Sequence, residues 1–259
     1  MTRTSRPLVL LSNDDGYQSA GLGALRGALG HHADLITVAP ETEQSAASHA
    51  LSLHRPLRLR QVEEGAFAVD GTPADCVYIA LHSGLRVLPR WPDLVMSGIN
   101  HGLNLGQDVF YSGTVAAARE AALRGLPAIA ASAHPDQDLA QVAVLSARLA
   151  LSLLETTTSP RPILLNLNVP QRWTGEVRAT RLGERVYDHT IEFRTDPRGR
   201  EYLWIGGTGV RHRSDPGSDT DAYDDGAASI TPLVLDLTRT DDGPIVEALA
   251  QSLTHPLST

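Results

Sequence analysis

The feature that most constrains the fold is an apolar run at residues 8–11 that ends in the polar turn Asn13-Asp14-Asp15-Gly16. Four consecutive apolar residues predict a strand that is buried on both faces, as in a parallel sheet. Residues 21–29 then repeat leucine at helical spacing. A strand, a glycine turn and a helix in this order place the turn at the carboxyl edge of a sheet, where open α/β folds bind their ligands.

Asp14 and Asp15 put two carboxylates side by side in this turn. Adjacent negative charges are unfavourable unless water or a cation neutralises them. Such a pair is most often a solvated turn, so the pair alone does not separate a surface turn from a site for a divalent metal ion. The metal site requires further ligands from elsewhere in the chain.

Residues 8–168 alternate between strand-like and helix-like segments, which predicts a mostly parallel sheet with crossover helices. The predicted strands are residues 8–11, 35–39, 67–69, 94–96, 128–131 and 163–168. The predicted helices are residues 21–29, 73–85, 113–124 and 139–154. Residues 51–60 alternate apolar and polar side chains and are expected to be extended. The expected fold class is α/β, with helices flanking the sheet.

After about residue 174 the pattern changes to short β segments with a turn signal at residues 196–199. This texture is typical of β-hairpins rather than of strand–helix–strand units. One more strand at residues 229–236 and a final helix at residues 245–253 follow. We therefore expect residues 1–174 to form the core that carries the site. Residues 175–259 are expected to form a β-rich extension with a returning strand and a C-terminal helix.

The polar stretch before the returning strand contains Asp219, Asp221, Asp224 and Asp225. Acidic runs of this kind are usually solvated, and we expect a surface loop here. Isolated histidines such as His49 are likewise expected to be structural or exposed rather than functional.

Composition excludes several classes of function. The formal net charge of −8 argues against general binding of duplex nucleic acid, which needs a positive surface. All 22 basic residues are arginine, so P-loop and Schiff-base lysines are absent. The single cysteine, Cys76, excludes an internal disulfide framework and a thiolate-rich metal site. No apolar run reaches the length expected for a bilayer span, and the N-terminus lacks a signal-peptide core. We therefore expect a cytoplasmic protein without a membrane partner.

Further oxygen donors follow two other predicted strands. Ser45 lies beyond the second strand, and Asn100 and Asn104 lie in a glycine-rich segment, residues 97–106, that is expected to be a loop after the next buried strand. Together with the two aspartates they form a hard donor set without clustered histidine or cysteine. Such a set suits Mg²⁺, Mn²⁺ or Ca²⁺ better than zinc.

Ser112-Gly113-Thr114 begins a long alanine-rich helix. The first turn of a helix carries free N–H groups and the positive end of the helix dipole, and phosphate is the usual anion bound there. Ser112 and Thr114 are also explained as a simple capping pair, which is compatible with that role. A cation beside an anion seat is the arrangement that hydrolysis of a phosphate ester requires.

With these segments in view, the chain resembles the SurE family of survival proteins, which are metal-dependent 5′/3′-nucleotidases with acid phosphatase activity. The resemblance rests on SNDDGYQSAGLGAL, VDGTPADCVYIAL, PDLVMSGINHGLNLGQDVFYSGTVAAAREAALRGLPAIAAS, LNLNVP, TRLGERVYDHT and TDAYDDGAASITPL, in this order. It covers about residues 8–233. NDDG alone is weak, but together with the SGIN and YSGTVAAA blocks it is specific. The resemblance implies a Rossmann-like core, nucleoside monophosphate substrates, and assembly into a homodimer or homotetramer.

The resemblance also implies roles for individual residues. One divalent metal ion per subunit would be held by Asp14, Asp15, Ser45 and Asn100. The substrate phosphate would be held by Asn104, Ser112, Gly113 and Thr114, with Asn13 supporting the metal loop. Among these, Asp14, Asp15, Asn104 and Ser112 are the expected catalytic residues. The metal would lower the pKa of a water that attacks phosphorus in line, although an aspartate nucleophile is the alternative.

One departure from the family pattern lies next to Ser45, where Ala46 replaces the usual glycine. If that position requires a positive φ, alanine strains the loop. Two other functions share part of this pattern. A non-catalytic nucleotide-binding or assembly protein would keep the fold but would not require paired carboxylates. A phosphatase of the haloacid dehalogenase type expects an Asp-x-Asp spacing and usually a lysine, and neither is present.

Overall fold

The computed structural model describes residues 6–156, 161–188, 190–206 and 209–254. Within this part of the chain, nine strands form one sheet in the order β3-β4-β2-β1-β5-β6-β7-β13-β8. These strands are β1 (Leu8–Ser12), β2 (Asp34–Pro40), β3 (Leu59–Glu63), β4 (Ala66–Val69), β5 (Leu94–His101), β6 (Ala128–Ala133), β7 (Leu164–Val169), β8 (Val177–Ala179) and β13 (Ala228–Leu233). The pairs from β4 to β7 are all parallel, which confirms the predicted α/β class.

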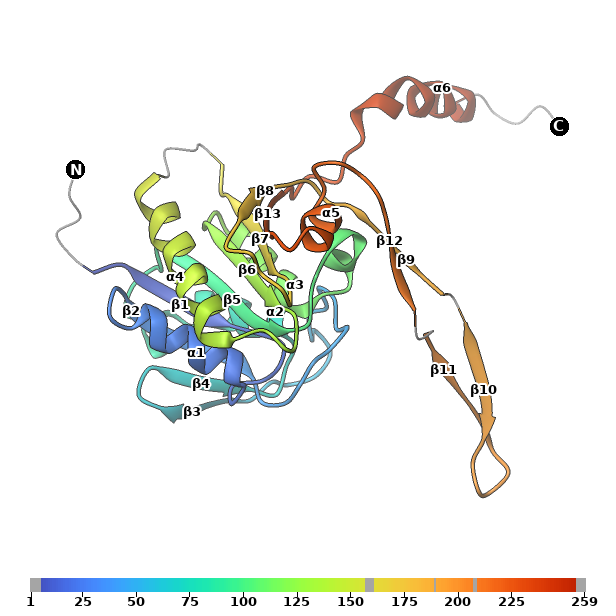
Figure 1. The fold of residues 1–259 in the computed structure, drawn as a ribbon. Coiled ribbons are helices and arrows are strands. Elements are labelled where there is room, and N and C mark those ends of the chain that lie inside the picture. The colour runs from blue at the N-terminus through green and yellow to red at the C-terminus, as the bar shows by residue number, and fades with distance from the viewer. Residues whose placement is uncertain (1–5, 157–160, 189, 207–208, 255–259) are drawn as a thin grey trace.

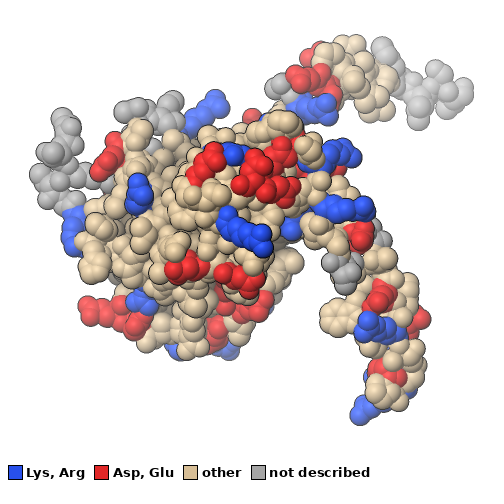
Figure 2. Space-filling model, in the orientation of Figure 1, with Lys and Arg blue, Asp and Glu red and all other residues tan. Residues whose placement is uncertain are grey.

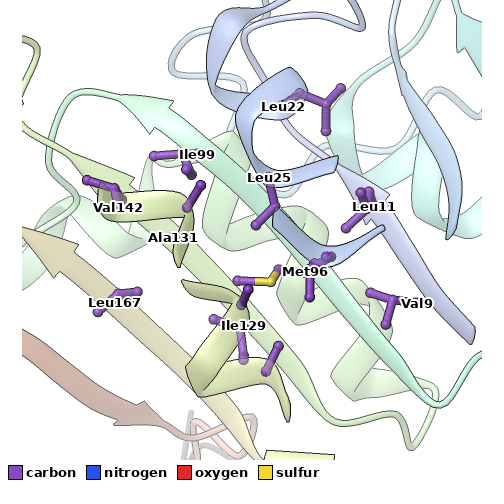
Figure 3. Close-up of a cluster of buried hydrophobic side chains, with 14 of the residues drawn as sticks. Val9, Leu11, Leu22, Leu25, Met96, Ile99, Ile129, Ala131, Val142 and Leu167 are labelled. Carbon is purple, nitrogen blue, oxygen red and sulfur yellow. The ribbon is translucent and has the colours of Figure 1, made fainter. Parts of the chain in front are cut away.

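Helices cover both faces of the sheet (Figure 1). α1 (Ala20–Leu29) and α4 (Leu139–Thr156) pack on one face, and α2 (Pro73–His82) and α3 (Gly113–Leu123) pack on the other. Figure 3 shows the first of these interfaces, in which apolar side chains of the strands meet those of the two helices. The labelled members are Val9, Leu11, Leu22, Leu25, Met96, Ile99, Ile129, Ala131, Val142 and Leu167.

The order of the strands reverses at β1, because the chain passes to β2 on one side and later returns to β5 on the other. Both neighbours are parallel to β1, so the carboxyl ends of β1 and β5 meet at one edge. In doubly wound sheets, ligands bind in the crevice at this reversal point. The Asn13–Gly16 turn therefore lies where the sequence placed it, at the carboxyl end of the sheet.

Three local expectations were wrong. Residues 51–58 are irregular, and only the end of the alternating segment forms β3. Part of the glycine-rich segment is not a loop, because β5 continues to His101 with a register shift against β6. Among the described residues, one helix, α4, is long and apolar enough to cross a membrane by length and composition. It packs on the sheet and on α1 with a buried face, and it serves there as a core helix.

Beyond β7 the chain adds β8 to the sheet, leaves it through β9 to β12, and returns to it as β13. β13 returns antiparallel to β7, whereas β9 (Glu184–Tyr187) pairs with β12 (Val210–Arg213) outside the sheet. β10 (Ile191–Thr195) and β11 (Glu201–Ile205) form the predicted hairpin, which projects from the body (Figure 1). The turn is closed where the amide of Asp196 donates to the carbonyl oxygen of Arg200, at 2.8 Å.

The remaining helical elements are short or lie at the end of the described chain. They are the 3₁₀ helices η1 (Gly84–Arg86), η2 (Gly106–Phe110) and η3 (Thr240–Asp242) and the α-helices α5 (Asp219–Asp224) and α6 (Gly243–Thr254). α6 extends away from the body in Figure 1. On the face shown in Figure 2, arginine and acidic side chains are interspersed, which differs from the continuous basic surface of a duplex-binding protein.

Candidate active site

A cavity of about 600 Å³ opens at the carboxyl edge of β1 and β5. Six of the residues that the sequence singled out line it, namely Asp14, Asp15, Ser45, Asn100, Asn104 and Ser112. They come from four separate segments of the chain, so the fold brings together side chains that the sequence could only associate by their position after strands.

Asp14 is the most buried acid of the cavity, with 6% of its surface exposed. The hydroxyl of Thr114 donates a hydrogen bond to its Oδ1. A Cβ atom added to Gly113 would lie 2.8 Å from the Cβ of Asp14 and 2.9 Å from its Oδ2. The start of α3 is therefore pressed directly against this carboxylate, and only glycine permits the approach.

Burial, together with the charge of Asp15, raises the pKa of Asp14 to about 6 in spite of the lowering effect of the Thr114 hydrogen bonds. Burial also raises the pKa of Asp15, whose Oδ2 accepts a 3.2 Å hydrogen bond from the amide of His101. Glu43, a third acid on the cavity wall, acts on Asp15 in the same direction. Negative charge is thus concentrated here without an arginine partner among the described ion pairs.

This concentration of carboxylates fits a divalent cation. The donors are hard oxygens, and a cation would offset both the burial and the smaller charge repulsion that raise the pKa values of Asp14 and Asp15. Among the described residues, no group of three or more His, Cys, Asp or Glu side chains is arranged to hold a metal ion. The candidate set contains only two acids, completed by a serine and an asparagine, so such a search does not detect it.

The buried side chain of Asn13 holds the turn in place through hydrogen bonds. It is fully buried, and its Nδ2 donates to the carbonyl oxygen of Gly16 at 2.9 Å and to Oγ of Ser19 at 2.7 Å. Ser19 in turn caps α1. These bonds fix the path of the chain between β1 and α1.

Ser45 lies at the exposed rim of the cavity, and its hydroxyl donates a 2.6 Å hydrogen bond to Glu43. The neighbouring Ala46 has a φ of 57°, in the left-handed region. The strain that the sequence predicted if alanine replaced a positive-φ glycine is therefore present in the loop.

Ala46→Gly is expected to stabilise the protein by up to about 1 kcal/mol. A left-handed L-residue costs roughly 1–2 kcal/mol, of which the greater backbone entropy of glycine offsets roughly 0.5–1 kcal/mol. Urea unfolding measures the difference, with Ala47→Gly as the matched control because Ala47 has no positive φ. A gain in the control as large as that in Ala46→Gly would contradict the strain.

Asn100 stands at the end of β5, with its Nδ2 donating to the carbonyl oxygen of Gly102 at 2.9 Å. This bond occupies the amide nitrogen and leaves Oδ1 as the atom available to a cation. The same residue lines the cavity opposite the Asp14 turn, on the strand adjacent to β1.

Asn104 is 7% exposed and is held by a network of buried polar side chains. Its amide nitrogen Nδ2 donates to Oγ of Ser132 at 2.8 Å. Its backbone N–H donates to Oδ1 of Asn168 at 2.8 Å, and its carbonyl oxygen accepts from Nδ2 of Asn166 at 2.7 Å. It does not adopt the left-handed conformation that would explain an asparagine in a turn. Three residues on β6 and β7 thus fix one amide at the cavity wall.

The start of α3 has the geometry of an anion seat. Ser112 is the N-cap, and its Oγ accepts from the amide of Val115 at 3.1 Å. The amides of Gly113 and Thr114 have no intrahelical acceptor, because the first turn of a helix leaves its N–H groups free. The Thr114 hydroxyl is engaged by Asp14, and the backbone amide of Thr114 also acts on that carboxylate as a hydrogen-bond donor. Ser112 lines the cavity, whereas Gly113 and Thr114 lie behind it and are not among its lining residues.

The sequence reasoning missed the outer wall of the cavity, which includes Asp108, Tyr111 and Tyr187. The Tyr187 hydroxyl donates to Asp108 at 2.6 Å, and Arg185 forms an ion pair with the same carboxylate. Burial and Asp108 both raise the pKa of Tyr187. Tyr187 lies far along the chain in β9, within the segment TRLGERVYDHT, but that segment alone does not indicate that Tyr187 reaches the cavity, so only the fold reveals this contribution.

The acidic run is not a simple solvated loop. Asp219 is fully buried at the start of α5, where its carboxylate accepts from the amides of Gly106 at 2.9 Å and Gly183 at 2.7 Å. Asp224 and Asp225 are exposed, as expected. The buried member joins η2, which precedes α3, to the chain that enters β9.

Comparison with known proteins gives consistent matches over most of the chain. The model of the family described as survival protein SurE matches residues 9–189. A protein named 5'-nucleotidase SurE from Sorangium cellulosum is 59% identical over 252 residues, covering 96% of this chain and 97% of that protein. Relatives with the same name from Anaeromyxobacter dehalogenans strain 2CP-C and Myxococcus xanthus are 52% and 50% identical, each over 89% of this chain and over 91% and 88% of the relative.

A solved structure is also similar. The crystal structure of the SurE protein from Aquifex aeolicus superimposes with a TM-score of 0.81 at 35% sequence identity. The match covers 94% of this chain and all of that one. The likeness therefore extends beyond the sheet to the segments that follow it.

Proposed function

The chain belongs to the SurE family, and from this membership and the site we propose that it is a 5′-nucleotidase that hydrolyses nucleoside monophosphates with the help of a divalent metal ion. Relatives that carry the name 5'-nucleotidase SurE support the activity. The metal requirement, and hydrolysis of 3′-monophosphates as well, are parts of the proposal. The observation that carries it is the placement of Asp14 directly against the first turn of α3.

In this proposal Asp14, Asp15, Ser45 and Asn100 hold one Mg²⁺, Mn²⁺ or Ca²⁺ ion per subunit. Their oxygens are the ligand types that these ions prefer. When bound, the ion supplies Lewis-acid polarisation of the phosphate and lowers the pKa of a water molecule.

Groups of the protein itself bind and orient the phosphate. The first turn of α3, which contains Gly113 and Thr114 and has the helix dipole behind it, binds the phosphoryl oxygens and stabilises the charge that grows on them. Asn104 lines the cavity with its side chain fixed by Ser132, and it serves as a further phosphate-binding residue. The hydroxyl of Ser112, at the cavity wall, caps the helix and so fixes the position of its first turn.

Phosphate release from a nucleoside 5′-monophosphate tests the proposal. The protein stripped with EDTA should release no phosphate above background, and Mn²⁺ or Mg²⁺ should restore turnover. Undiminished turnover after EDTA treatment would contradict the metal requirement. Nucleotide binding without phosphate release at any metal concentration would instead support a non-catalytic binding protein.

We also propose that the protein is a cytoplasmic homodimer or homotetramer. On the β10–β11 hairpin, Ile191 and Phe193 lie opposite Ile205 and Leu203, so one face of the ribbon is a continuous apolar stripe. These four side chains are all about half exposed or more. Exposed apolar patches of this kind commonly mark protein interfaces, and a second copy of the chain is the expected occupant.

Charges introduced into this stripe are expected to lower the oligomeric state. The double variant Phe193→Glu with Leu203→Glu puts two like charges opposite each other on the face that would be buried. Light scattering coupled to size-exclusion chromatography measures the mass. Leu85→Glu is the control, since Leu85 is an isolated leucine that is 86% exposed in η1. An unchanged mass in the double variant would contradict assembly through the hairpin.

A further inference from the structure

Glu120 is a buried acid that the proposed chemistry does not use. It lies in α3, among alanine and valine side chains, and only 2% of its side chain is exposed. A buried carboxylate is costly unless it is hydrogen-bonded and paired, and replacing such pairs with apolar residues is often neutral or stabilising. Stability alone therefore gives little reason for an acid at this position.

Both oxygens of Glu120 have partners. Oε1 accepts from Nε of Arg124 at 3.0 Å, one turn further along the helix. Oε2 pairs with Nε2 of His49 at 2.8 Å. The first contact stays within α3, whereas the second reaches across 71 residues of sequence to the segment that carries Ser45.

That segment, residues 44–49, crosses the mouth of the cavity. At its beginning the amide of Gln44 donates to the carbonyl oxygen of Asp14 at 2.8 Å. Near its end the amide of Ser48 donates to the carbonyl oxygen of Tyr111 at 3.0 Å, and its hydroxyl donates to that of Phe110 at 2.6 Å. The segment thus spans from the metal turn to the chain that enters α3, with Ser45 between the two attachments.

The backbone of this segment is strained. Ala46 and Ser48 have φ values of 57° and 52°, and they are the non-glycine residues with positive φ in the described chain. Strained conformations persist only where the surroundings hold them in place. The His49–Glu120 contact supplies such a hold from a rigid helix, directly after the second strained residue.

We propose that Glu120 is a positioning residue that acts through His49 to hold residues 44–49 and thereby presents Ser45 to the metal ion. This inference rests on the proposed role of Ser45 as a ligand. Both ends of α3 then serve the same site. The N-terminus of the helix seats the phosphate, and Glu120, near its C-terminal end, holds Ser45 in place as a ligand of the cation.

Binding of Mn²⁺ alone to the EDTA-stripped full-length protein tests the proposal, measured by isothermal titration calorimetry. Removal of groups that orient a metal ligand typically weakens binding by about 10–100-fold. His49→Ala and Glu120→Ala are each expected to weaken Mn²⁺ binding by about tenfold. Glu120→Gln should bind Mn²⁺ with nearly the wild-type affinity, because an amide can still hydrogen-bond to the imidazole of His49 and accept from Arg124. Arg124→Gln is the matched control and should leave Mn²⁺ binding unchanged.

Combination with Ser45→Ala separates positioning from general structural support. If Glu120 acts through Ser45, Ser45→Ala with His49→Ala should bind Mn²⁺ no more weakly than Ser45→Ala alone. Fully additive losses, or wild-type affinity in both His49→Ala and Glu120→Ala, would overturn the proposal. His49→Ala keeps the test valid if Glu120→Ala fails to fold, as checked by circular dichroism.

The proposed function fails in a different way. If the wild-type protein binds no Mn²⁺, or if Asp14→Asn binds it as tightly as the wild type, the metal site itself is wrong. If the wild type binds and Asp14→Asn does not, the site stands and the variants of His49 and Glu120 decide the inference.

Discussion

Asp14→Asn should abolish turnover and at the same time stabilise the metal-free protein at neutral pH. An amide is a poor ligand beside Asp15, so the loss should be several kcal/mol of transition-state stabilisation, or roughly 10³-fold in rate. The stabilisation follows from the pKa of about 6 for Asp14. The buried carboxylate is forced to ionise at pH 7, and the amide is not.

The sign of the pH dependence follows from the same pKa. Because the folded-state pKa exceeds the unfolded value of 3.8, the folded state binds more protons between about pH 4 and pH 6. The stability of the metal-free protein should therefore fall as the pH rises through this window and change no further above it. A shift of this size corresponds to about 3 kcal/mol.

Urea unfolding of both proteins in EDTA, from pH 4 to pH 8, measures this effect as the difference between wild type and Asp14→Asn. Titrating groups that do not interact with Asp14 cancel in the difference, whereas Asp15, which is coupled to Asp14, contributes a smaller residual change. The Thr114 hydroxyl can still donate to the amide oxygen of the variant, so the packing is retained. Equal pH profiles would contradict the buried and uncompensated charge, and near-normal turnover would remove Asp14 from the metal site.

Gly113→Ala is the second change with a large expected effect. The added methyl group would lie 2.8 Å from Cβ of Asp14 and 3.0 Å from Cγ of Pro73. Neither neighbour is the end of a flexible chain, so Asp14 and the first turn of α3 must move apart. A misplacement of about 1 Å can cost about 10²-fold in rate. We expect a fall in kcat/KM of at least that size.

Gly23→Ala is the control for this variant. Gly23 also lies in the first turns of a helix, α1, and a Cβ there meets nothing within 4 Å. This substitution should leave kcat/KM unchanged and raise stability by up to about 1 kcal/mol, because alanine is the better helix former. If both variants keep full activity, close contact between Asp14 and α3 is not needed for catalysis.

The inner part of the site was predictable because each piece is local. A buried strand followed by Asn13-Asp14-Asp15-Gly16, and a capped helix start at Ser112, carry their geometry in a few adjacent residues. The order of strands and helices then places both at one edge of the sheet. The positive φ at Ala46 was anticipated only as a condition, from the glycine that the resembled family carries at this position, and the structure meets that condition.

The outer wall and the supporting contacts were not predictable from pattern. Tyr187 reaches Asp108 across 79 residues of sequence, and Glu120 reaches His49 across 71. Asp219 resembles its exposed neighbours in composition, yet its two amide donors come from segments 113 and 36 residues away. Such contacts depend on how the crossover helices and loops pack in three dimensions, and the hydrophobic periodicity of the sequence does not indicate them.

The site also explains why the protein tolerates an unfavourable charge. Burying Asp14 near Asp15 and Glu43 lowers the stability of the metal-free fold, but the same arrangement favours a cation at the mouth of α3. Natural proteins commonly accept such local costs at functional sites. The stability gained by Asp14→Asn and the turnover lost in it should therefore have one cause.

Crystals grown with Mn²⁺ and inorganic phosphate provide the most direct measurement, through the anomalous scattering of manganese. We predict one manganese peak about 2.1 Å from oxygens of both Asp14 and Asp15. A phosphate bound beside it should contact the first turn of α3, at Ser112-Gly113-Thr114. A manganese peak away from these two carboxylates, or a phosphate that does not touch the start of α3, would contradict the account.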